Sequence, residues 1–270
     1  MLVRIWALGT WLIVIAGCAQ QPVTSTAEST DSSTVQIAES VVERTTDTQV
    51  LAAKQPIRID NPYGDVRVRF GGYESTLEWR TVAQNAAATH KIAVTSSNQT
   101  NFVVSARLPE GIALAADQRI EITAYVPQGH DLEILTEHGL IEVRGVQANV
   151  RARSATGNIA FRGIVGLIDI ETGGGNIEGQ IDPAAAGTRQ RVSATTGNIV
   201  LGLVEGLNAT LDMATSGVFA TEFSVDIVPQ PGQEPNKTAR AVIGKPESNI
   251  EVVSKRGEIR LLRRLEFRPA

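Results

Sequence analysis

The sequence predicts an all-β fold, a repetitive β-solenoid-like domain with repeats of about 20 residues. Apolar and polar residues alternate beyond residue 55, as in "IRIDNPYGDVRVRF" at 57–70, which is the period of a half-buried strand. β-branched residues are frequent, and Gly or Pro separates the runs. One turn recurs, as "SATGNI" at 154–159, "GGGNI" at 173–177 and "SATTGNI" at 193–199. Such repetition indicates architecture, because a catalytic loop needs only one copy.

The N-terminal segment, residues 1–17, predicts a lipoprotein signal peptide. Arg4 precedes an apolar stretch that is shorter than the roughly 20 residues of a membrane-spanning helix. Residues 15–18, "IAGC", resemble the bacterial lipobox, and this resemblance implies cleavage before Cys18 and lipid modification (palmitate) of that residue. Cys18 is the only cysteine in the chain. We therefore expect a membrane anchor through a covalent lipid on Cys18, and no membrane span.

Three segments follow the signal peptide. Residues 18–50 begin with the lipidated cysteine and are rich in Ser, Thr, Gln and Glu, which predicts a flexible tether. Residues 51–127 are predicted to be an N-terminal β region, and residues 128–270 a glycine-cornered β-repeat region. The one helix candidate is residues 81–89, "TVAQNAAAT".

The repeat has the form apolar-x-apolar-x-(Ser/Thr/Asn)-x-x-Gly-x-apolar-x-apolar, as in "VRARSATGNIAF" at 150–161. The small polar residue ends the strand. We expect the glycine to turn the chain with a positive φ, which glycine adopts without steric cost and Asn tolerates. The copy around Gly217 is slipped by one residue. The predicted structural repeat corners are Gly64, Gly139, Gly157, Gly175, Gly197, Gly217 and Gly257.

Two architectures place corners in this way. Gly-Asn between alternating runs is also a hairpin signal, which predicts an antiparallel β-sandwich or meander. The alternative is a solenoid in which each repeat forms one coil. The spacings from Gly139 to Gly217 are 18, 18, 22 and 20 residues, which is the near-regularity of coils stacked in chain order.

Outward-facing charges favour the solenoid. Four positions before the corner glycine, Arg153 in one copy is followed by Glu171 in the next. Stacked coils lie about 4.8 Å apart, so opposite charges in successive copies would face each other. Six positions before the glycine, the sign alternates from copy to copy: Glu133, Arg151, Asp169 and Arg191.

These copies, led by "IEITAYVPQGHDLEILTEHGLIEVRGV" at 120–146, resemble a known bacterial family. It is the putative-adhesin domain of unknown function numbered 4097. The resemblance covers residues 119–261, with 57–70 as an outlying copy. It implies a repetitive β-strand domain of an envelope protein, and it brings no established catalytic residues. Residues 228–237, "VPQPGQEPNK", depart from the repeat and predict an excursion loop.

Composition and motifs point away from nucleic acid, metal and nucleotide chemistry. The net charge of −4 gives no electrostatic reason to expect nucleic acid. His90, His130 and His138 lack the spacing of a zinc motif, and we expect them to be solvated in loops. "GGGNIEG" at 173–179 does not fit GxGxxG. We predict no metal site and no cofactor.

A carboxylate pair beside an aromatic residue would suit a polysaccharide-cleaving enzyme, because glycosidases need two acids at a set separation. The aromatic candidates are Trp79 and Tyr125. Because acids and arginines alternate on an outward face, we interpret the acids as an ion-paired surface and predict no enzyme activity. The acidic candidates are Glu133, Glu142, Asp169, Glu171 and Glu178.

The sequence therefore predicts a non-catalytic, lipid-anchored envelope protein whose β-repeat domain acts by surface contact, as an adhesin or an envelope scaffold. The partner would be an envelope protein or a polysaccharide. The alternatives are a polysaccharide-active enzyme on a β-solenoid and a periplasmic sensor or scaffold subunit. Self-association is a further alternative, because solenoid ends expose strand edges. Ala19, where an aspartate would favour inner-membrane retention, favours the outer membrane if the organism is Gram-negative.

Overall fold

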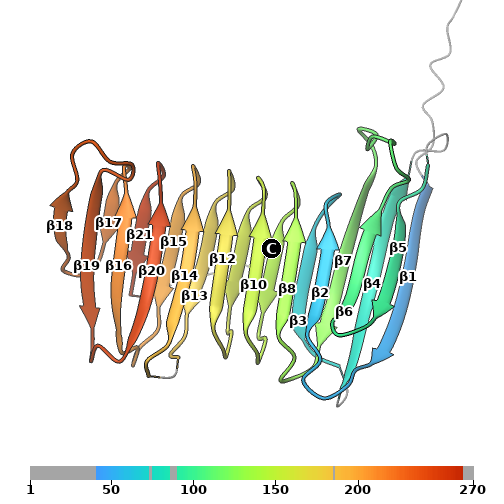
Figure 1. Cartoon of the computed structure of the whole chain (residues 1–270), viewed down its shortest axis with the longest axis horizontal. Helices are drawn as coiled ribbons and strands as arrows, with labels where there is room; N and C mark the ends of the chain where they lie inside the picture. The colour runs from blue at the N-terminus through green and yellow to red at the C-terminus, as the bar shows by residue number, and fades with distance from the viewer. Residues whose placement is uncertain (1–40, 73–74, 86–89, 185, 264–270) are drawn as a thin grey trace, which may run out of the picture. The chain divides into compact units, whose positions relative to one another are not determined.

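Two β-sheets with one hydrophobic core between them make up the described part of the protein (Figure 1). The computed structural model describes residues 41–72, 75–85, 90–184 and 186–263, all within the unit Ala38–Ala270. These residues form 21 strands, with 10 in sheet A and 11 in sheet B, and no helix. The predicted all-β fold is confirmed. In the described ranges, no helix is long and apolar enough to cross a membrane.

The domain is a stack of coils, each of which gives its first strand to sheet B and its second strand to sheet A. Strands of neighbouring coils pair in parallel, so the predicted solenoid is confirmed and the antiparallel meander is not observed among the described coils. In order along the stack, the coils are β6–β7 (Phe102–Arg107, Arg119–Val126), β2–β3 (Ile57–Asn61, Val66–Phe70), β8–β9 (Leu132–Thr136, Ile141–Arg144), β10–β11 (Val150–Ser154, Ile159–Arg162), β12–β13 (Ile168–Thr172, Ile177–Ile181), β14–β15 (Arg189–Ala194, Ile199–Leu203), β20–β21 (Ser248–Ser254, Ile259–Leu262) and β16–β17 (Ala209–Thr215, Phe219–Thr221).

Antiparallel strands extend both ends of the stack. Beyond the β6–β7 coil, β4 (Thr76–Asn85) and β1 (Val41–Val50) extend sheet A, and β5 (Ala93–Asn98) extends sheet B. Beyond β16, β19 (Lys237–Ile243) and β18 (Asp226–Pro229) extend sheet B. Since these strands pair antiparallel, the parallel coil pattern stops at both ends.

Near both ends the coils leave the order of the chain. The coil that contains Gly64 lies directly beside the coil that contains Gly139, so it is a full member of the stack. The expectation that the coils of Gly197 and Gly217 are neighbours is wrong, because the coil of Gly257 lies between them. The spacing of glycines in the sequence measures the length of a coil, and it does not identify the neighbouring coil.

Two predicted boundaries change. Residues 41–50, assigned to the tether, form β1 and pair with all ten residues of β4, while residues 18–40 lie outside the described residues. The division between residues 127 and 128 is no break in the sheets, because β7 pairs with β3 and β3 pairs with β9.

Two smaller predictions also change. Residues 81–85, predicted as helix, are the end of β4, with Thr81, Ala83 and Asn85 buried at the period of a strand. Residues 228–237, predicted as an excursion loop, contain the end of β18 and the start of β19, so they connect the two strands of an antiparallel hairpin.

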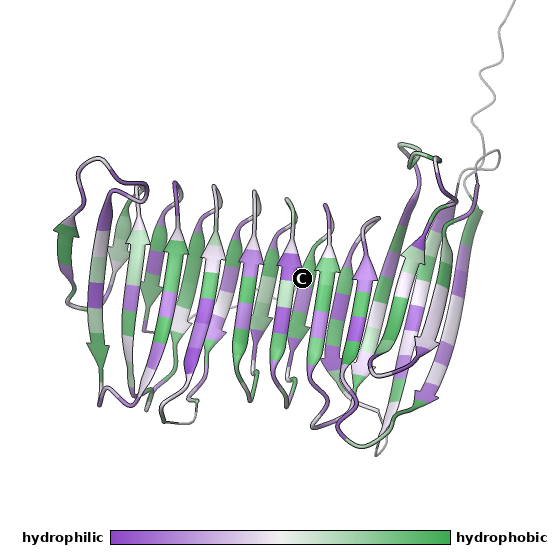
Figure 2. Cartoon of the chain, in the orientation of Figure 1, coloured by the Kyte–Doolittle hydropathy of each residue, from purple (hydrophilic) through white to green (hydrophobic). Residues whose placement is uncertain are grey.

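The core consists of inward-facing rows that run from coil to coil, and Figure 2 shows the matching alternation of hydropathy along the strands. Each row stacks equivalent positions of the repeat, and every burial of a large aliphatic side chain contributes about 1.5–3 kcal/mol. One row of sheet B is at most 3% exposed throughout: Ile59, Ile134, Ala152, Ile170, Val192, Val252 and Met213.

The seven predicted corner glycines form one column at the turns between the sheets. Their predicted conformation is wrong, because none of them has a positive φ. What requires glycine is close packing: a Cβ on Gly175 would lie closer than 3.0 Å to the carbonyl group of Gly157, a separation that real Cβ atoms essentially never show. The same clash recurs between Gly157 and Gly139, and between Gly257 and Gly197.

A column of buried hydroxyl groups satisfies the glycine backbone at this corner. The Thr172 hydroxyl donates to the carbonyl of Gly157 (3.0 Å) in the neighbouring coil and accepts from the N–H of Gly175 (3.1 Å) in its own coil. Ser254 repeats the pattern, donating to Gly197 (2.8 Å) and accepting from Gly257 (2.9 Å). In both of these copies the small polar residue of the repeat therefore bridges two coils.

The asparagine that follows the corner glycine forms a second, exposed column. The Asn158 side-chain oxygen accepts from the backbone N–H of Asn176 (2.8 Å). The Asn176 oxygen accepts in turn from Asn198 (2.9 Å), and the Asn198 oxygen from Glu258 (2.8 Å). In "TGN" the asparagine thus links one coil to the next, and tolerance of a positive φ is not its role.

We expect Gly175→Ala to destabilise the protein by about 3 kcal/mol, because the new Cβ would overlap backbone that cannot move away without separating two coils. Urea unfolding of the purified full-length protein measures this change in free energy.

Gly174→Ala is the matched control, since a Cβ there would make only ordinary contacts of 3.7 Å with Thr156. We expect it to change stability by less than about 1 kcal/mol. Equal effects of the two adjacent substitutions would contradict the close-packing explanation.

We expect Ala194→Ser to stabilise the protein by about 1 kcal/mol. Ala194 is in register with Thr172 and Ser254, so it interrupts the hydroxyl column. Among the described residues, the N–H of Gly197 has no hydrogen-bond acceptor, and a serine hydroxyl at 194 would supply one. Thermal and urea denaturation measure the gain.

The control is Ala152→Ser, at a fully buried position inside a row of aliphatic side chains. An unpartnered hydroxyl there is expected to cost about 1–3 kcal/mol. If both serines destabilise the protein, the hydroxyl column is not a stabilising feature.

Candidate interaction surfaces

The outer face of sheet B carries a ladder of alternating charges, as predicted. Arg151 is in register with both Glu133 and Asp169, and its guanidinium lies 3.0 Å from the Asp169 carboxylate. A further member, Arg58, lies 3.2 Å from Glu133. Stacking of opposite charges in successive coils is therefore confirmed for these pairs, each of which is worth about 0–1 kcal/mol at an exposed position.

The second predicted row is also paired, but the ladder has one exception. Arg153 lies 3.2 Å from Glu171. Arg191 is in register with Asp169 and Glu251, yet it forms no ion pair among the described residues. Other arginines already bind both carboxylates, as Arg189 does at 2.6 Å from Glu251. Arg191 therefore leaves an uncompensated guanidinium on this face.

An open groove of about 980 Å³ runs across this ladder. It is lined by charged residues of both rows and by residues at the start of the strands, and no aromatic residue is among them. Its shape suits an extended partner, because successive coils repeat the same features along its length.

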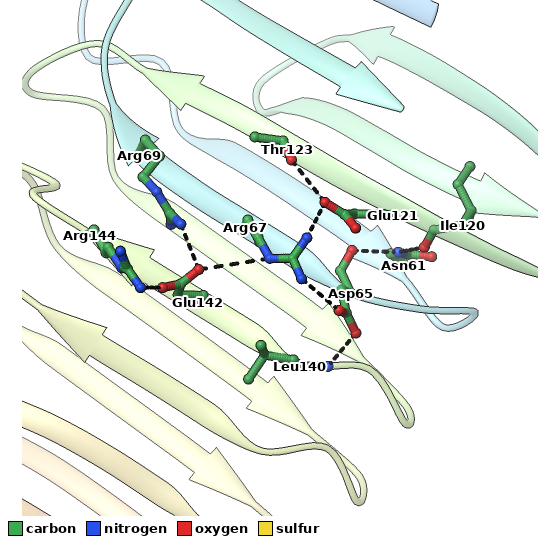
Figure 3. A network of polar contacts seen from close by, with 10 residues as sticks. All are labelled: Asn61, Asp65, Arg67, Arg69, Ile120, Glu121, Thr123, Leu140, Glu142 and Arg144. Carbon is green, nitrogen blue, oxygen red and sulfur yellow. Dashed lines mark hydrogen bonds and ion pairs between the residues drawn. The ribbon is translucent and has the colours of Figure 1, made fainter. Parts of the chain in front are cut away.

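The outer face of sheet A carries a denser cluster, in which three arginines surround one carboxylate (Figure 3). Glu142 is only 8% exposed. Its Oε2 lies 2.6 Å from Arg69 and 3.8 Å from Arg67, and its Oε1 forms an ion pair with Arg144. Arg67 also pairs with Glu121. The single carboxylate of Glu142 is thus shared among three cations.

This arrangement shifts the pKa values of the cluster. Burial disfavours the charged form of Glu142, but Arg69, Arg144 and Arg67 outweigh it and hold the pKa of the carboxyl below its usual value of 4.5. The hydrogen bond to Glu121 raises the pKa of Arg67 against the opposing effect of burial. Both groups are therefore charged at neutral pH.

An arginine row extends from this cluster across three neighbouring coils. Arg144 is in register with Arg69 on one side and with Arg162 on the other, so like charges are stacked here. Tyr125 continues the row beyond Arg69, and the guanidinium of Arg80 lies 5.2 Å from the centre of its ring. We refer to Arg69, Arg144 and Arg162 as the arginine row.

Sequence reasoning missed this row, although the sequence contains its signal. Each of its arginines stands five positions after a corner glycine, in three coils that are neighbours in the stack. The acidic and basic positions that alternate before the glycine lie on sheet B. A comparison of the residues five positions after each corner glycine would have identified the row on sheet A.

The five acidic candidates for catalysis do not converge. Glu178 is exposed on sheet A, in register with Ala160 and Val200, and forms no ion pair among the described residues. The other four are ion-paired with arginines: Glu133, Glu142, Asp169 and Glu171. Of the two aromatic candidates, Trp79 is 5% exposed and packs on Phe102 at 5.4 Å in the core, so it lines no outer surface.

The histidines and the cysteine have separate positions. The expected solvation is wrong for His130, which is 3% exposed with Nδ1 at 2.9 Å from the Gln55 carbonyl oxygen. His138 is exposed, with Nδ1 at 2.8 Å from the Thr156 hydroxyl. In the described ranges, no three His, Cys, Asp or Glu side chains form a group able to hold a metal ion. Cys18 lies outside the described residues.

Together these features define a β-solenoid with open, charged outer faces. The sequence matches no protein-family model and no curated protein, so its resemblance to the putative-adhesin family stays a prediction. Three crystal structures are similar to it. A putative cell adhesion protein from Clostridium sporogenes has 12% sequence identity and a TM-score of 0.48, with 81% of this chain and 99% of that chain covered. A putative adhesin from Bacteroides fragilis has 13% identity and a TM-score of 0.40, with coverages of 82% and 97%, and one from Parabacteroides merdae has 11% identity and a TM-score of 0.26, with coverages of 82% and 96%. Similarity at this level does not by itself assign a function.

We expect Glu142→Gln to lower stability at pH 7 by about 2 kcal/mol, since the arginines around it would lose their shared carboxylate. Because the folded-state pKa of Glu142 is lowered, folding favours the carboxylate. Its contribution is complete above the unfolded-state pKa and is lost as the pH falls through the folded-state value. The difference between variant and wild type should therefore shrink below about pH 4.5. Urea unfolding across pH measures it.

The control is Glu178→Gln, at an exposed position without an ion pair in the described structure. It should leave stability nearly unchanged at every pH. A Glu142→Gln variant with the stability and pH profile of the wild type would contradict the role given to this carboxylate.

Proposed function

We propose that the protein is a lipid-anchored component of the bacterial cell envelope that acts by non-covalent surface contact, as an adhesin or an envelope scaffold. The observation that carries the proposal is the outer face of sheet B. Rows of paired charges border an open groove there, and arginines hold four of the five acids that line it, all but Asp131. Such a face can recognise an extended partner through repeated contacts, whereas general acid–base catalysis requires carboxyls with distinct environments.

Support for the anchor comes from the sequence. Cys18 follows a lipobox-like "IAG", and Ala19 after it favours the outer membrane if the organism is Gram-negative. Twenty-two residues (19–40) separate Cys18 from the first residue of β1. A chain of that length spans at most about 80 Å, which is enough to hold the domain clear of lipid headgroups.

We expect Cys18→Ser to abolish lipid attachment, because Cys18 is the only thiol in the chain. Metabolic labelling with a clickable fatty acid should give a labelled wild-type band and no labelled variant band. After cell fractionation, the lipidated wild type should enter the detergent phase. Labelling of the variant at wild-type level would contradict the anchor.

The contact role needs a test in cells. We expect antibody against the β domain to bind intact cells, and cells that lack the protein to lose attachment to surfaces or to one another. Protease treatment of intact cells provides the control, since it should remove an outward-facing domain. Protection of the domain in intact cells would instead support a periplasmic scaffold or sensor, and unchanged attachment would contradict the adhesin role.

A further inference from the structure

The alternating charges on sheet B form a row that is complementary to itself. Six coils that are neighbours in the stack each contribute one outward-facing residue, and the sign alternates from one end of the row to the other (Figure 1). Val103 precedes the row on one side, and a second acid, Asp212, follows it on the other. We refer to six residues as the central row: Arg58, Glu133, Arg151, Asp169, Arg191 and Glu251. Because their number is even, turning the row end for end places each charge opposite one of the other sign.

A two-fold axis that runs along the strands, between β10 and β12, produces this reversal when two copies meet face to face. Such an axis leaves the direction of the strands unchanged and reverses the order of the coils. An interface with this symmetry is the commonest one between identical chains, and each of its contacts occurs twice. The pairs that it forms between copies in the central row are Arg151 with Asp169, Glu133 with Arg191, and Arg58 with Glu251.

The rows on either side of the central row have the same property under the same axis. Two positions further along the strands, Arg153 would face Glu171 of the second copy. Two positions back, Asp131 would face Arg189, since β8 and β14 lie equally far from the axis. All four arginines that line the groove thus meet an acid that also lines it.

Two charged groups of the groove gain partners that their own chain does not provide. Arg191 is exposed and forms no ion pair among the described residues. Asp131 likewise forms no ion pair there, and its Oδ1 accepts a hydrogen bond from the backbone N–H of Asn149 (3.3 Å). Across the axis, Arg191 would meet Glu133, and Asp131 would meet the exposed Arg189. The open groove leaves room for these side chains between the two sheets.

We propose that the outer face of sheet B binds the same face of a second copy of this protein in this two-fold arrangement. The inference rests on the proposed contact function and names the partner that fits the groove. Because the axis keeps the direction of the strands, Val41, the first residue of β1, lies at the same edge of both copies. Both copies can therefore be anchored to one membrane, which raises their effective concentration.

Other partners fit this face less well. A polymer of one charge, acidic or basic, would meet charges of its own sign at every second coil. A neutral polysaccharide would make no use of the charges that fill the groove. An unrelated protein would need alternating charges at the strand spacing of about 4.8 Å, which a second copy has by virtue of its own stack.

The test measures the mass of the purified full-length protein by sedimentation in density-matched detergent. We expect a dimer at micromolar concentration and low ionic strength. The dimer should dissociate as ionic strength rises, because its contacts join charged groups.

Charge reversal tests the register of the two copies. Glu133→Arg and Arg191→Glu each give a variant dimer two contacts between like charges, so each should weaken association roughly tenfold. Mixed in equal amounts, the two variants should associate as tightly as the wild type, because both contacts of the mixed dimer again join opposite charges. Since each chain of the mixture carries one change only, contacts within a chain cannot produce this rescue.

Arg191→Glu breaks no ion pair of its own chain, so it stays informative if Glu133→Arg, which loses the contact with Arg58, impairs folding. The matched control is Arg260→Glu, the same reversal at an exposed position of sheet A. It should leave association unchanged.

Three results would overturn the inference: a monomeric wild type at low ionic strength, variants that associate as tightly as the wild type, or a mixture that associates no better than the separate variants. Equal weakening by Arg260→Glu would place the contact elsewhere and would also overturn it. None of these results affects lipid labelling or the accessibility of the domain on cells, so failure of the inference and failure of the proposed function are distinguishable.

Discussion

The close approach of neighbouring coils at the glycine corner is the constraint on which the rest of the structure depends. No Cβ fits between Gly175 and the carbonyl group of Gly157, so only glycine allows the turns to stack at the spacing of paired strands. Once the turns stack, the register of the strands on both sides is set. Each position of the repeat then becomes a row, apolar inside and charged outside. The Thr172 hydroxyl shows how the buried backbone at this corner is satisfied.

The repeat and its two-residue alternation were sufficient to predict the fold class, the inward rows and the pairing of Arg151 with Asp169, because these follow from local pattern and from stacking. The position of the coil of Gly257 was not predictable in this way, since the repeat pattern is the same whichever coil pairs with it. The role of the corner glycines was also mistaken. A positive φ and a close approach of backbone both require glycine, so a recurring glycine in the sequence does not tell which of the two applies. Trp79 was misplaced because it lies outside the glycine repeats, although the alternation of β4 puts it on the inward face with Leu77 and Ala83.

The outer faces of the two sheets carry different distributions of charge on the same scaffold. On sheet B, acids and bases compensate each other in successive coils, which leaves a nearly balanced groove in which Arg191 has no ion pair with any described residue. On sheet A, the buried Glu142 holds several guanidinium groups close together and leaves a row of like charge. A repeat fold permits this contrast because substitutions at one outward-facing position of the repeat change one row of side chains and leave the core unchanged. Contact along a row, made of many weak and similar interactions, is a natural use of such a surface.

The most direct test of this account is hydrogen exchange at the corner amides of the intact protein. The N–H groups of Gly157, Gly175 and Gly257 donate to buried hydroxyls, whereas that of Gly197 has no acceptor among the described residues. We expect the first three to exchange only through global unfolding and Gly197 to exchange much faster. If all four amides exchange at the rate of exposed turns, the corner is not the constraint that holds the coils together.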